Sequence, residues 1–115
     1  MRVLIVDDEF MIATDTATVL EDAGCEIVGI AGSVDNALEI LDKSQCDGVI
    51  LDANLNGKSA EPVAAALRQR DISYLVVSGY RKDQLPEGLA GAPFLRKPYR
   101  VTELVAAVLS LGREA

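Results

Sequence analysis

Short runs of consecutive apolar residues recur along the chain at intervals that fit buried strands. The runs are rich in β-branched side chains, and several are apolar at every position, which is typical of parallel strands covered on both faces. They lie at Val3 to Val6, Ile27 to Ala31, Val49 to Leu51, Tyr74 to Val77 and Phe94 to Leu95. The pattern therefore predicts five strands of a parallel sheet.

Between these runs, apolar residues are spaced three and four positions apart, which predicts amphipathic helices. The four clear segments carry these sets: Ile12, Val19 and Leu20; Ala37, Leu38 and Leu41; Val63, Ala64 and Leu67; and Leu104, Val108 and Leu111. Ser33 and Thr102 are candidate N-caps. Pro62 suits a first helical turn, and Gly24 suits a C-terminal stop.

Strand and helix alternate along the chain, and right-handed crossovers between parallel strands give an α/β fold with a sheet between two helix layers. One connection is irregular. The stretch from Arg81 to Ala92 contains Pro86, Gly88 and Gly91, and only Asp83 to Leu85 has helical character. We therefore predict a short or irregular fourth helix.

Length and charge restrict the class of protein. The chain has 115 residues, 50% of them hydrophobic, which is enough for one packed core and too little for two, so we expect one domain over residues 1–115. The net charge of −7 argues against binding to nucleic acid or to a membrane surface. No apolar run approaches the ~20 residues that span a bilayer, and Asp7 interrupts the first run early. We therefore expect no signal peptide and a cytoplasmic location.

Two cysteines, Cys25 and Cys46, do not have the spacing of metal ligands. In an intracellular domain, such residues are more often small core side chains than partners in a disulfide. We assign them no function.

Polar residues follow the strands at their carboxyl ends, where open α/β sheets carry their chemistry. Asp7 and Asp8 follow the first strand, and Asp52 ends the third. Ser78 follows the fourth strand, and Lys97 follows the fifth. Since these strand ends meet at one edge of the sheet, we expect the five side chains to lie together.

Three carboxylates at one edge repel one another, by about 4 kcal/mol for a pair of charges ~4 Å apart at an effective dielectric of 20. A bound cation would relieve this repulsion, and oxygen ligands suit a hard ion such as Mg²⁺. Asp52 could then attack phosphorus while Ser78 and Lys97 meet the phosphoryl oxygens on the side away from the metal. The residues predict a Mg²⁺-dependent phosphoryl site with Asp52 as the nucleophile.

At these positions the sequence resembles the receiver domain of two-component response regulators. The motifs LIVDDE, VILDANL, VVSGY and FLRKPY occur in family order, each at its expected strand end, and the resemblance covers essentially all of the chain. It implies a flavodoxin-like, CheY-like fold with strand order 2-1-3-4-5. It also implies signal transduction, in which a histidine kinase, a phosphotransfer protein or a small phosphodonor supplies a phosphoryl group. The group then switches partner binding, or the domain relays or drains phosphate.

The resemblance also implies residue roles. Asp52 is the phosphoacceptor and, with Asp8, binds Mg²⁺ directly, while Asp7 acts mainly through a bound water. The backbone carbonyl of Asn54 is a further metal ligand. Such a domain catalyses only its own phosphorylation and dephosphorylation, so we expect it not to be an enzyme acting on other substrates.

Further family roles concern the other side of the phosphoryl group. Ser78 and Lys97 hold it, and the peptide bond between Lys97 and Pro98 is cis. The family switch uses an aromatic residue three positions before the lysine, which is here Phe94 and has no hydroxyl. Tyr80, two residues after Ser78, is a second aromatic that could gate access to the site.

Two segments are similar to an alphaproteobacterial subgroup of single-domain receivers. They begin at the ends of the third and fourth strands and read LDANLNGKSAEPVAAALRQR and SGYRKDQLPEGLAGAPFLRKP. That similarity implies that no output domain follows and that the phosphorylated face itself recruits an unknown downstream protein. The short segment between Ser78 and Lys97 departs from the wider family, so the usual output surface is altered.

Each residue also has a simpler structural interpretation. Asp7 and Asp8 could cap the first helix, where a carboxylate gains ~0.3–1 kcal/mol. Asp52 could be a turn residue, Ser78 a loop hydroxyl and Lys97 a solvated lysine. In the same way, the ring of Phe94 could belong to the core and that of Tyr80 to the surface. Capping explains only the first pair, whereas a phosphoryl site explains all five polar residues together.

Three other functions remain to be compared. An aspartate-nucleophile phosphatase or mutase also uses an aspartyl phosphate and Mg²⁺, but it needs a general acid two residues after the nucleophile, where this chain has Asn54. An interaction module that no longer depends on phosphorylation would not require all five site residues. Dinucleotide binding is disfavoured because no G-x-G-x-x-G follows the first strand.

Overall fold

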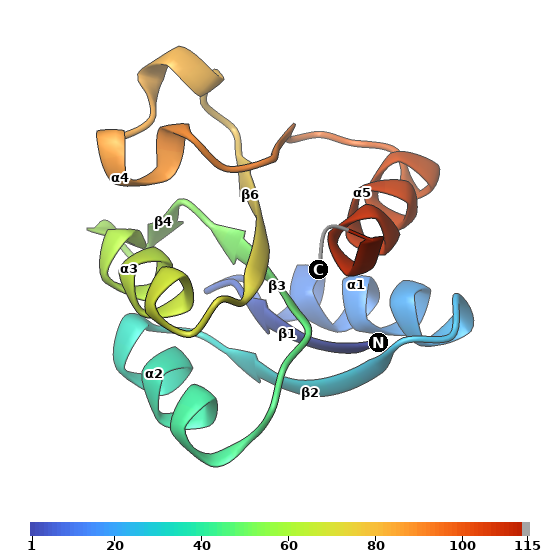
Figure 1. The fold of residues 1–115 in the computed structure, drawn as a ribbon. Coiled ribbons are helices and arrows are strands. Elements are labelled where there is room, and N and C mark those ends of the chain that lie inside the picture. Colours follow the sequence, from blue (N-terminus) through green and yellow to red (C-terminus); the bar gives the residue numbers. More distant parts are fainter. Residues whose placement is uncertain (114–115) are drawn as a thin grey trace.

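A parallel five-stranded sheet forms the centre of the protein, as seen in a computed structural model that describes residues 1–113 (Figure 1). Its strands are β1 (Arg2–Val6), β2 (Glu26–Ala31), β3 (Gly48–Asp52), β6 (Ser73–Ser78) and β7 (Phe94–Arg96). They are arranged in the order β2-β1-β3-β6-β7. The short strands β4 and β5 form a separate hairpin, so β6 and β7 are the fourth and fifth strands of the sheet. The order of the five strands is therefore 2-1-3-4-5, as predicted.

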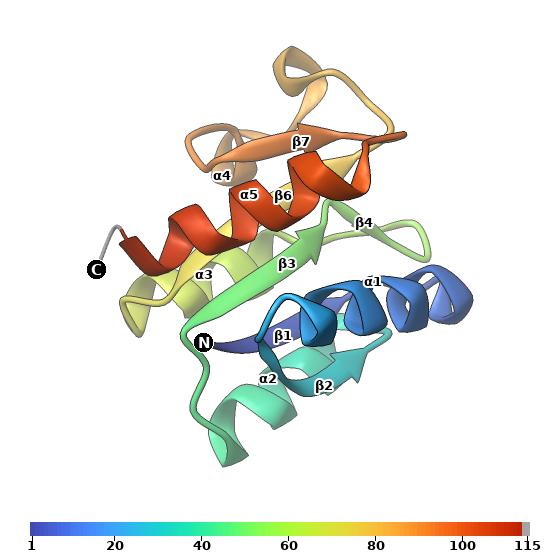
Figure 2. The same ribbon diagram turned by 90° about the vertical axis from the view of Figure 1, so that its right-hand side faces the viewer.

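Helices cover both faces of this sheet. They are α1 (Phe10–Asp22), α2 (Val34–Lys43), α3 (Glu61–Gln69), α4 (Glu87–Ala90) and α5 (Val101–Arg113). Figures 1 and 2 show α1 and α5 on one face, and α2 and α3 on the other. The fourth connection contains a 3₁₀ turn, η1 (Lys82–Gln84), and the four-residue helix α4, which confirms the prediction of a short fourth helix.

The sheet separates two hydrophobic clusters, which explains why the strands are apolar at every position. Val3 and Ile5 of β1 pack on the side of α1 and α5, while Leu4 and Val6 pack on the side of α2 and α3. Because successive side chains of a strand point to opposite faces, a strand covered on both sides needs apolar residues throughout. The continuous runs are therefore the direct signature of a sheet between two helix layers.

The buried face of α1 consists mainly of small residues. Ala13, Thr16, Ala17 and Leu20 are buried, whereas Ile12 is 40% exposed. The four buried residues recur at helical spacing and form the face turned to the sheet, whereas Ile12 lies at the side of that face. Apolar spacing predicted this helix but did not identify its whole buried face.

Three of the four predicted helix signals are confirmed. The Ser33 hydroxyl accepts a hydrogen bond from the backbone N–H of Asn36 at 3.1 Å. Pro62 lies in the first turn of α3, and Gly24 follows the end of α1 with a φ of +95°. Only glycine adopts that left-handed conformation at little cost, so Gly24 ends the helix cleanly.

The predicted N-cap at Thr102 is wrong. The helix α5 begins at Val101, so Thr102 lies inside its first turn. The carbonyl of Arg100 accepts from the N–H of Leu104 at 3.0 Å, and the N–H of Arg100 donates to the Glu103 carboxylate at 3.1 Å. This is the carboxylate half of a capping box, with Arg100 ahead of the helix. A carboxylate at the third helical position therefore replaces the hydroxyl cap.

We expect Ser33→Ala to lower the free energy of unfolding by about 1 kcal/mol, because the N–H of Asn36 loses its acceptor. The matched control is Thr102→Ala, which removes a hydroxyl from the first turn of α5 without removing a cap and should change stability by no more than ~0.5 kcal/mol. Urea titration of both variants measures the difference. Equal destabilisation by the two substitutions would contradict the assignment of the caps.

A β-hairpin that apolar spacing did not predict follows Asp52. Its strands are β4 (Asn54–Leu55) and β5 (Lys58–Ser59), which pair antiparallel. The connecting residues Asn56 and Gly57 have φ values of +54° and +81°. Positive φ at both central positions suits a type I′ turn, and the Asn-Gly pair is the strongest short signal for it. The signal is present in the sequence, but strands of two residues are too short to show alternation.

The cysteines are free thiols, in agreement with the sequence-based expectation. Cys25 is buried in the cluster on the side of α1 and α5, and Cys46 is partly buried on the opposite face of the sheet. The expected small core role holds for Cys25 and in part for Cys46.

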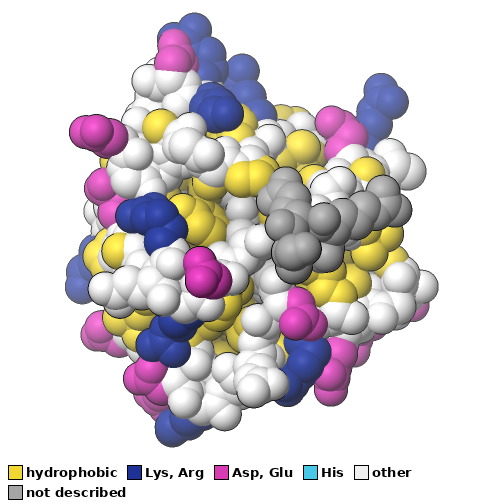
Figure 3. All heavy atoms as spheres, in the orientation of Figure 1, with side chains coloured by type: hydrophobic (Ala, Val, Ile, Leu, Met, Phe, Trp, Pro, Cys, Tyr) yellow, Lys and Arg dark blue, Asp and Glu magenta, His cyan; other side chains and the backbone are white. Residues whose placement is uncertain are grey.

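The surface shows charges of both signs close together on the face seen in Figure 1 (Figure 3). The acidic residues are therefore not gathered on this face into a region of one sign.

No helix within residues 1–113 is both long and apolar enough to cross a membrane.

Candidate functional site at the carboxyl edge of the sheet

All five predicted residues lie at the carboxyl edge of the sheet. Asp7 and Asp8 follow β1, Asp52 is the last residue of β3, Ser78 is the last of β6, and Lys97 follows β7. Asp52 pairs in register with Val77, the neighbour of Ser78. Asp7, Asp52 and Ser78 are only 6%, 7% and 3% exposed, which is unusual for polar residues at the end of a strand. The parallel sheet thus brings together residues that are far apart in the sequence.

Three carboxylates form the centre of the site. One carboxylate oxygen from each of Asp7, Asp8 and Asp52 lies within 4.8 Å of the others. Two of these groups are buried, so water screens their charges poorly. The arrangement therefore concentrates negative charge in a small volume at the edge of the sheet.

Backbone N–H groups orient each of these carboxylates. Asp7 Oδ1 accepts from the N–H of Glu9 at 2.9 Å, and Asp52 Oδ1 accepts from the N–H of Asn54 at 3.0 Å. Asp8 Oδ2 accepts from the N–H of Asn56 at 3.1 Å. The hairpin of β4 and β5 therefore positions two of the three carboxylates.

The role of Asn56 was not recognised from the sequence, although the Asn56-Gly57 pair signals the turn that positions it.

The simpler interpretation of Asp7 and Asp8, as caps of the first helix, does not describe the structure. The residue that precedes α1 is Glu9, and no side chain caps this helix. The N–H that Asp7 accepts from belongs to Glu9, which lies ahead of the helix. The two carboxylates are therefore directed to the sheet edge and not to the start of α1.

Lys97 is the cation of the site. Its Nζ donates to Asp52 Oδ2 at 2.8 Å and to Asp7 Oδ2 at 3.4 Å, so the ammonium lies between two carboxylates. Burial lowers the pKa of Lys97, but hydrogen bonding to Asp52 and the charges of Asp52 and Asp7 outweigh burial, so the pKa is raised. Lys97 therefore stays protonated and neutralises part of the carboxylate charge.

Asp7 experiences the opposite balance. Burial raises the pKa of its carboxyl group, and the charge of Asp52 raises it further, while the N–H of Glu9 and the ammonium of Lys97 lower it. The net pKa is raised. Lys97 compensates Asp7 only weakly because its shorter contact is with Asp52. One ammonium for three carboxylates leaves an excess of negative charge.

This donor set fits a hard divalent cation. The ligand atoms are carboxylate oxygens, which Mg²⁺ prefers, and a single ammonium, that of Lys97, lies among them. A divalent ion needs only a few protein oxygens at such a site, because water and phosphate oxygens complete its coordination. The residues present are therefore suited to Mg²⁺.

Ser78 and Tyr80 form a tight turn after β6. The Ser78 hydroxyl accepts from the N–H of Tyr80 at 3.0 Å, and its own proton remains available for donation. The side chain of Ser78 is buried at the end of β6, whereas Tyr80 is 58% exposed. The structure thus gives Ser78 a local turn contact in addition to its place at the site, and the gating role of Tyr80 stays a prediction.

Phe94 lies at the start of β7 and is half-buried. It packs against the hydrophobic cluster on the side of α2, α3 and α4. This contact fits a core role, and the switch role of Phe94 stays a prediction. At the other end of β7, the peptide bond between Lys97 and Pro98 is cis, as expected.

The fold and this edge define a class: α/β domains with three acidic residues, a hydroxyl and a lysine at the carboxyl ends of a parallel sheet of order 2-1-3-4-5. The sequence profile of the response regulator receiver domain matches residues 3–109. The chain belongs to this family and is a receiver domain of two-component response regulators.

Several known proteins are similar to the chain. The transcriptional regulatory protein PdtaR of Mycobacterium tuberculosis is 33% identical over 111 residues, which cover 93% of this chain and 54% of PdtaR. The chain spans about half the length of the curated relatives that it matches first. The solution structure of SdrG from Sphingomonas melonis Fr1 has a TM-score of 0.83 and 33% identity, covering 98% of this chain and 96% of SdrG.

A further solved structure is that of TrrA from Thermotoga maritima in complex with Mg²⁺ and BeF. It has a TM-score of 0.84 and 28% identity, and the match covers 96% of this chain and 97% of TrrA. The likeness therefore covers nearly the whole chain.

Proposed function

We propose that Asp52 accepts a phosphoryl group and that the domain acts as a reversible switch or phosphate relay in two-component signalling. The observation that carries this proposal is the position of Asp52. Its carboxylate is buried at the end of β3, and its Oδ2 accepts a hydrogen bond from Lys97 Nζ at 2.8 Å. It also lies close to the carboxylates of Asp7 and Asp8. A carboxylate held in this way can attack phosphorus without first being pulled out of the core.

In the proposed step, one carboxylate oxygen of Asp52 forms a bond to phosphorus while the bond between phosphorus and the donor breaks. The leaving group keeps the electron pair of that bond, and the product is an acyl phosphate on Asp52. Lys97 stabilises the charge on the phosphoryl oxygens, and the Ser78 hydroxyl donates to one of them. Water later attacks the phosphorus, the bond between phosphorus and the Asp52 oxygen breaks, and inorganic phosphate leaves as the carboxylate is regenerated.

Asp7, Asp8 and Asp52 would hold Mg²⁺, together with the backbone carbonyl of Asn54. When bound, the ion supplies positive charge that screens the approach of a dianionic donor to a carboxylate. TrrA, which shares the fold, is described with Mg²⁺ and BeF bound. The donor set of this chain supports the same requirement, because three carboxylates share one ammonium.

The proposed donors are a sensor histidine kinase, a phosphotransfer protein or a small phosphodonor such as acetyl phosphate. The reader of the signal is a downstream protein. The net charge of −7 disfavours direct contact with nucleic acid or with an anionic membrane. The partners are therefore proteins that recognise the edge of the sheet or the elements beside it.

We further propose that the chain modifies only itself and is not a phosphatase. The residue two positions after Asp52 is Asn54, whose amide is engaged in the hairpin turn, where its Oδ1 accepts from the N–H of Gly57 at 2.8 Å. An amide is not a general acid. Assays with small phosphate esters test this point, and many turnovers per minute would show an enzyme. The phosphoryl acceptor itself is tested by Mg²⁺-dependent mass gain in the wild type and in Asp52→Asn.

Added Mg²⁺ should raise the melting temperature, because the ion binds carboxylates that are assembled only in the folded state. At about ten times its dissociation constant, the ion adds ~1.4 kcal/mol of stability, or roughly 5 °C for a domain of this size. Asp8→Asn should lose most of this increase. Asp22→Asn, which changes an exposed carboxylate on the far end of α1, should retain it. Differential scanning fluorimetry measures the shifts, and equal shifts in both variants would place the ion elsewhere.

A further inference from the structure

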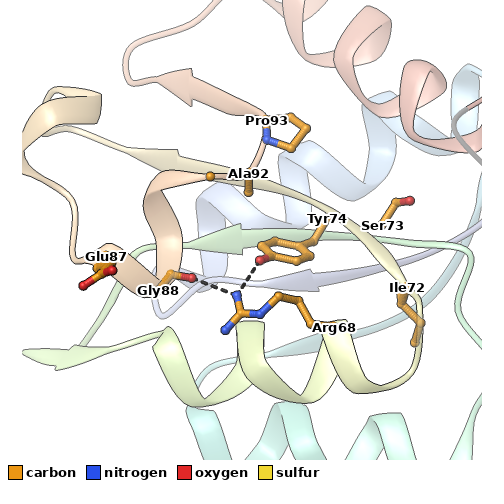
Figure 4. A pocket seen from close by; sticks show the side chains of 9 residues that line it. Arg68, Ile72, Ser73, Tyr74, Glu87, Gly88, Ala92 and Pro93 are labelled. Carbon is orange, nitrogen blue, oxygen red and sulfur yellow. Dashed lines mark hydrogen bonds between the residues drawn. The ribbon is translucent and has the colours of Figure 1, made fainter.

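One residue of α4, Gly88, is held on both sides by side chains of α3. The N–H of Gly88 donates to Glu61 Oε2 at 3.3 Å, and the carbonyl of Gly88 accepts from Arg68 Nη1 at 2.9 Å. Arg68 Nη1 also donates to the Tyr74 hydroxyl at 2.9 Å, as Figure 4 shows. Both polar backbone groups of Gly88 are therefore bound to α3.

The position of α4 depends on these contacts. A helix of four residues is far too short to be stable by itself. Leu89 anchors it in the core and is fully buried, while Glu87, the first residue of α4, is exposed. The backbone of α4 is thus held by one apolar side chain and by the two α3 side chains that bind Gly88. A change in either of these side chains changes the stability of α4.

Glu61 also contacts the hairpin that follows Asp52. Its Oε1 accepts from the Ser59 hydroxyl at 3.1 Å, and the same hydroxyl accepts from the N–H of Glu61 at 3.2 Å. Ser59 pairs with Asn54 across the hairpin, and the N–H of Asn54 donates to Asp52 Oδ1. We call these two contacts of the Glu61 carboxylate, with the Ser59 hydroxyl and with the N–H of Gly88, the Glu61 bridge. The bridge joins the hairpin beside Asp52 to α4.

We propose that the Glu61 bridge transmits the phosphorylation state of Asp52 to α4. The inference rests on the proposed function, because it requires that Asp52 change its chemical state. Formation of the acyl phosphate removes the charge of the carboxylate, so Oδ1 becomes a weaker acceptor for the N–H of Asn54. The phosphoryl group at the same time adds three strong acceptor oxygens beside the hairpin. The start of the hairpin is therefore reordered by the reaction, and Ser59 lies directly across from it.

This route uses groups that the aromatic switch does not contain. Phe94 has no hydroxyl, so its ring cannot donate a hydrogen bond to Ser78. Glu61 instead offers two carboxylate oxygens, one for the hairpin and one for α4. Hydrogen bonds to a charged group are stronger than bonds between neutral groups, which favours tight coupling of the two elements.

Amide hydrogen exchange of α4 tests the bridge. In the wild type, beryllofluoride with Mg²⁺ mimics the phosphoryl group on Asp52 and should slow exchange in a peptide covering 87–90. Gain of one hydrogen bond changes the equilibrium constant for local opening of a helix by about three- to tenfold. We therefore expect the exchange rate to fall by about the same factor. The same slowing should extend through Arg81 to Gly91, because this segment leads into α4.

Two substitutions separate the bridge from a general loosening of α4. Ser59→Ala removes the hydroxyl that joins the hairpin to Glu61, so the effect of beryllofluoride on α4 should fall below about twofold. Arg68→Gln is the matched control, because Arg68 holds Gly88 but does not contact the hairpin. It should speed exchange in both states and preserve the ratio between them.

Gly88→Ala gives an independent test. An added Cβ would lie 2.7 Å from Glu61 Oε2, the mobile end of a flexible side chain, so Glu61 must move away. Alanine favours a helix more than glycine does, so α4 should be at least as well formed while the bridge is broken. Exchange of the peptide covering 87–90 should then no longer respond to beryllofluoride.

The outcomes distinguish this inference from the proposed function. A chain that gains no phosphoryl mass on Asp52 overturns both. A chain that gains the mass but shows the same α4 exchange with and without beryllofluoride overturns the bridge alone. A response that persists unchanged in Ser59→Ala and Gly88→Ala also overturns it, whereas loss of the response in both, with retention in Arg68→Gln, establishes the bridge.

Discussion

Asp52→Asn abolishes the phosphoryl mass gain. With acetyl phosphate and Mg²⁺, the wild type should gain one phosphoryl group, and the variant should gain none, because an amide nitrogen or oxygen does not form a stable acyl phosphate. Asparagine keeps the size of the side chain and can still accept the N–H of Asn54, so the fold at the end of β3 is preserved. Intact-mass spectrometry of both proteins, acquired under mild conditions, measures the result.

A suitable control for this comparison is Asp22→Asn, which changes the same type of side chain on an exposed position and should keep the full mass gain. Beryllofluoride binding provides a second readout without hydrolysis, and it too should be lost in Asp52→Asn. An equal mass gain in wild type and Asp52→Asn would mean that another residue accepts the phosphoryl group. The central proposal would then be wrong.

Lys97→Met slows phosphoryl transfer by about 10²- to 10³-fold, the loss typical of removing one charge-stabilising donor from a buried site. Methionine keeps the apolar stem of the side chain and removes the ammonium that lies 2.8 Å from Asp52 and 3.4 Å from Asp7. The developing charge on the phosphoryl oxygens then has no fixed cation on this side. Quenched time points with acetyl phosphate, followed by mass spectrometry, give the rate.

The matched control is Lys82→Met, because Lys82 is an exposed lysine of the η1 turn and should leave the rate unchanged. The melting temperature of Lys97→Met must be recorded with the rate, since the variant leaves two buried carboxylates without their ammonium. Addition of Mg²⁺ should recover part of that stability. If folded Lys97→Met transfers the phosphoryl group at a rate within about threefold of wild type, its effect is no larger than that of an ordinary surface substitution. Lys97 would then have no part in the proposed mechanism.

Both predictions concern charges that the fold forces together. In this buried cluster of carboxylates around one ammonium, burial is the main cause of the raised pKa of Asp7, whereas Asp52 and Asp7 outweigh burial and raise the pKa of Lys97. Such a cluster is unfavourable for folding alone, because buried like charges oppose each other. The proposed function accounts for this cost, because a bound cation would supply positive charge to the cluster.

The sheet and its order were predictable because they depend on patterns that are local in sequence. Continuous apolar runs such as Val3 to Val6 identify strands covered on both faces, and the polar residue that ends each run marks the edge of the sheet. The caps show the limit of this reasoning. Ser33 caps α2 as predicted, but a carboxylate, Glu103, took the place expected for Thr102. Several side chains can satisfy one N–H, and only the path of the chain selects among them.

Residue type and short-range spacing were enough to predict the α/β class and the five polar residues at the strand ends. Contacts between distant segments depend instead on how the elements pack. Lys97 meets Asp52 across 45 positions, Asn56 orients Asp8 across 48, and Glu61 reaches Gly88 across 27. Hydrogen bonds of this kind depend on the register of packed elements and on individual side-chain rotamers, which no periodicity records. The position of Asp52 at a strand end was therefore recognisable in the sequence, whereas the Glu61 bridge to α4 became visible only in the folded protein.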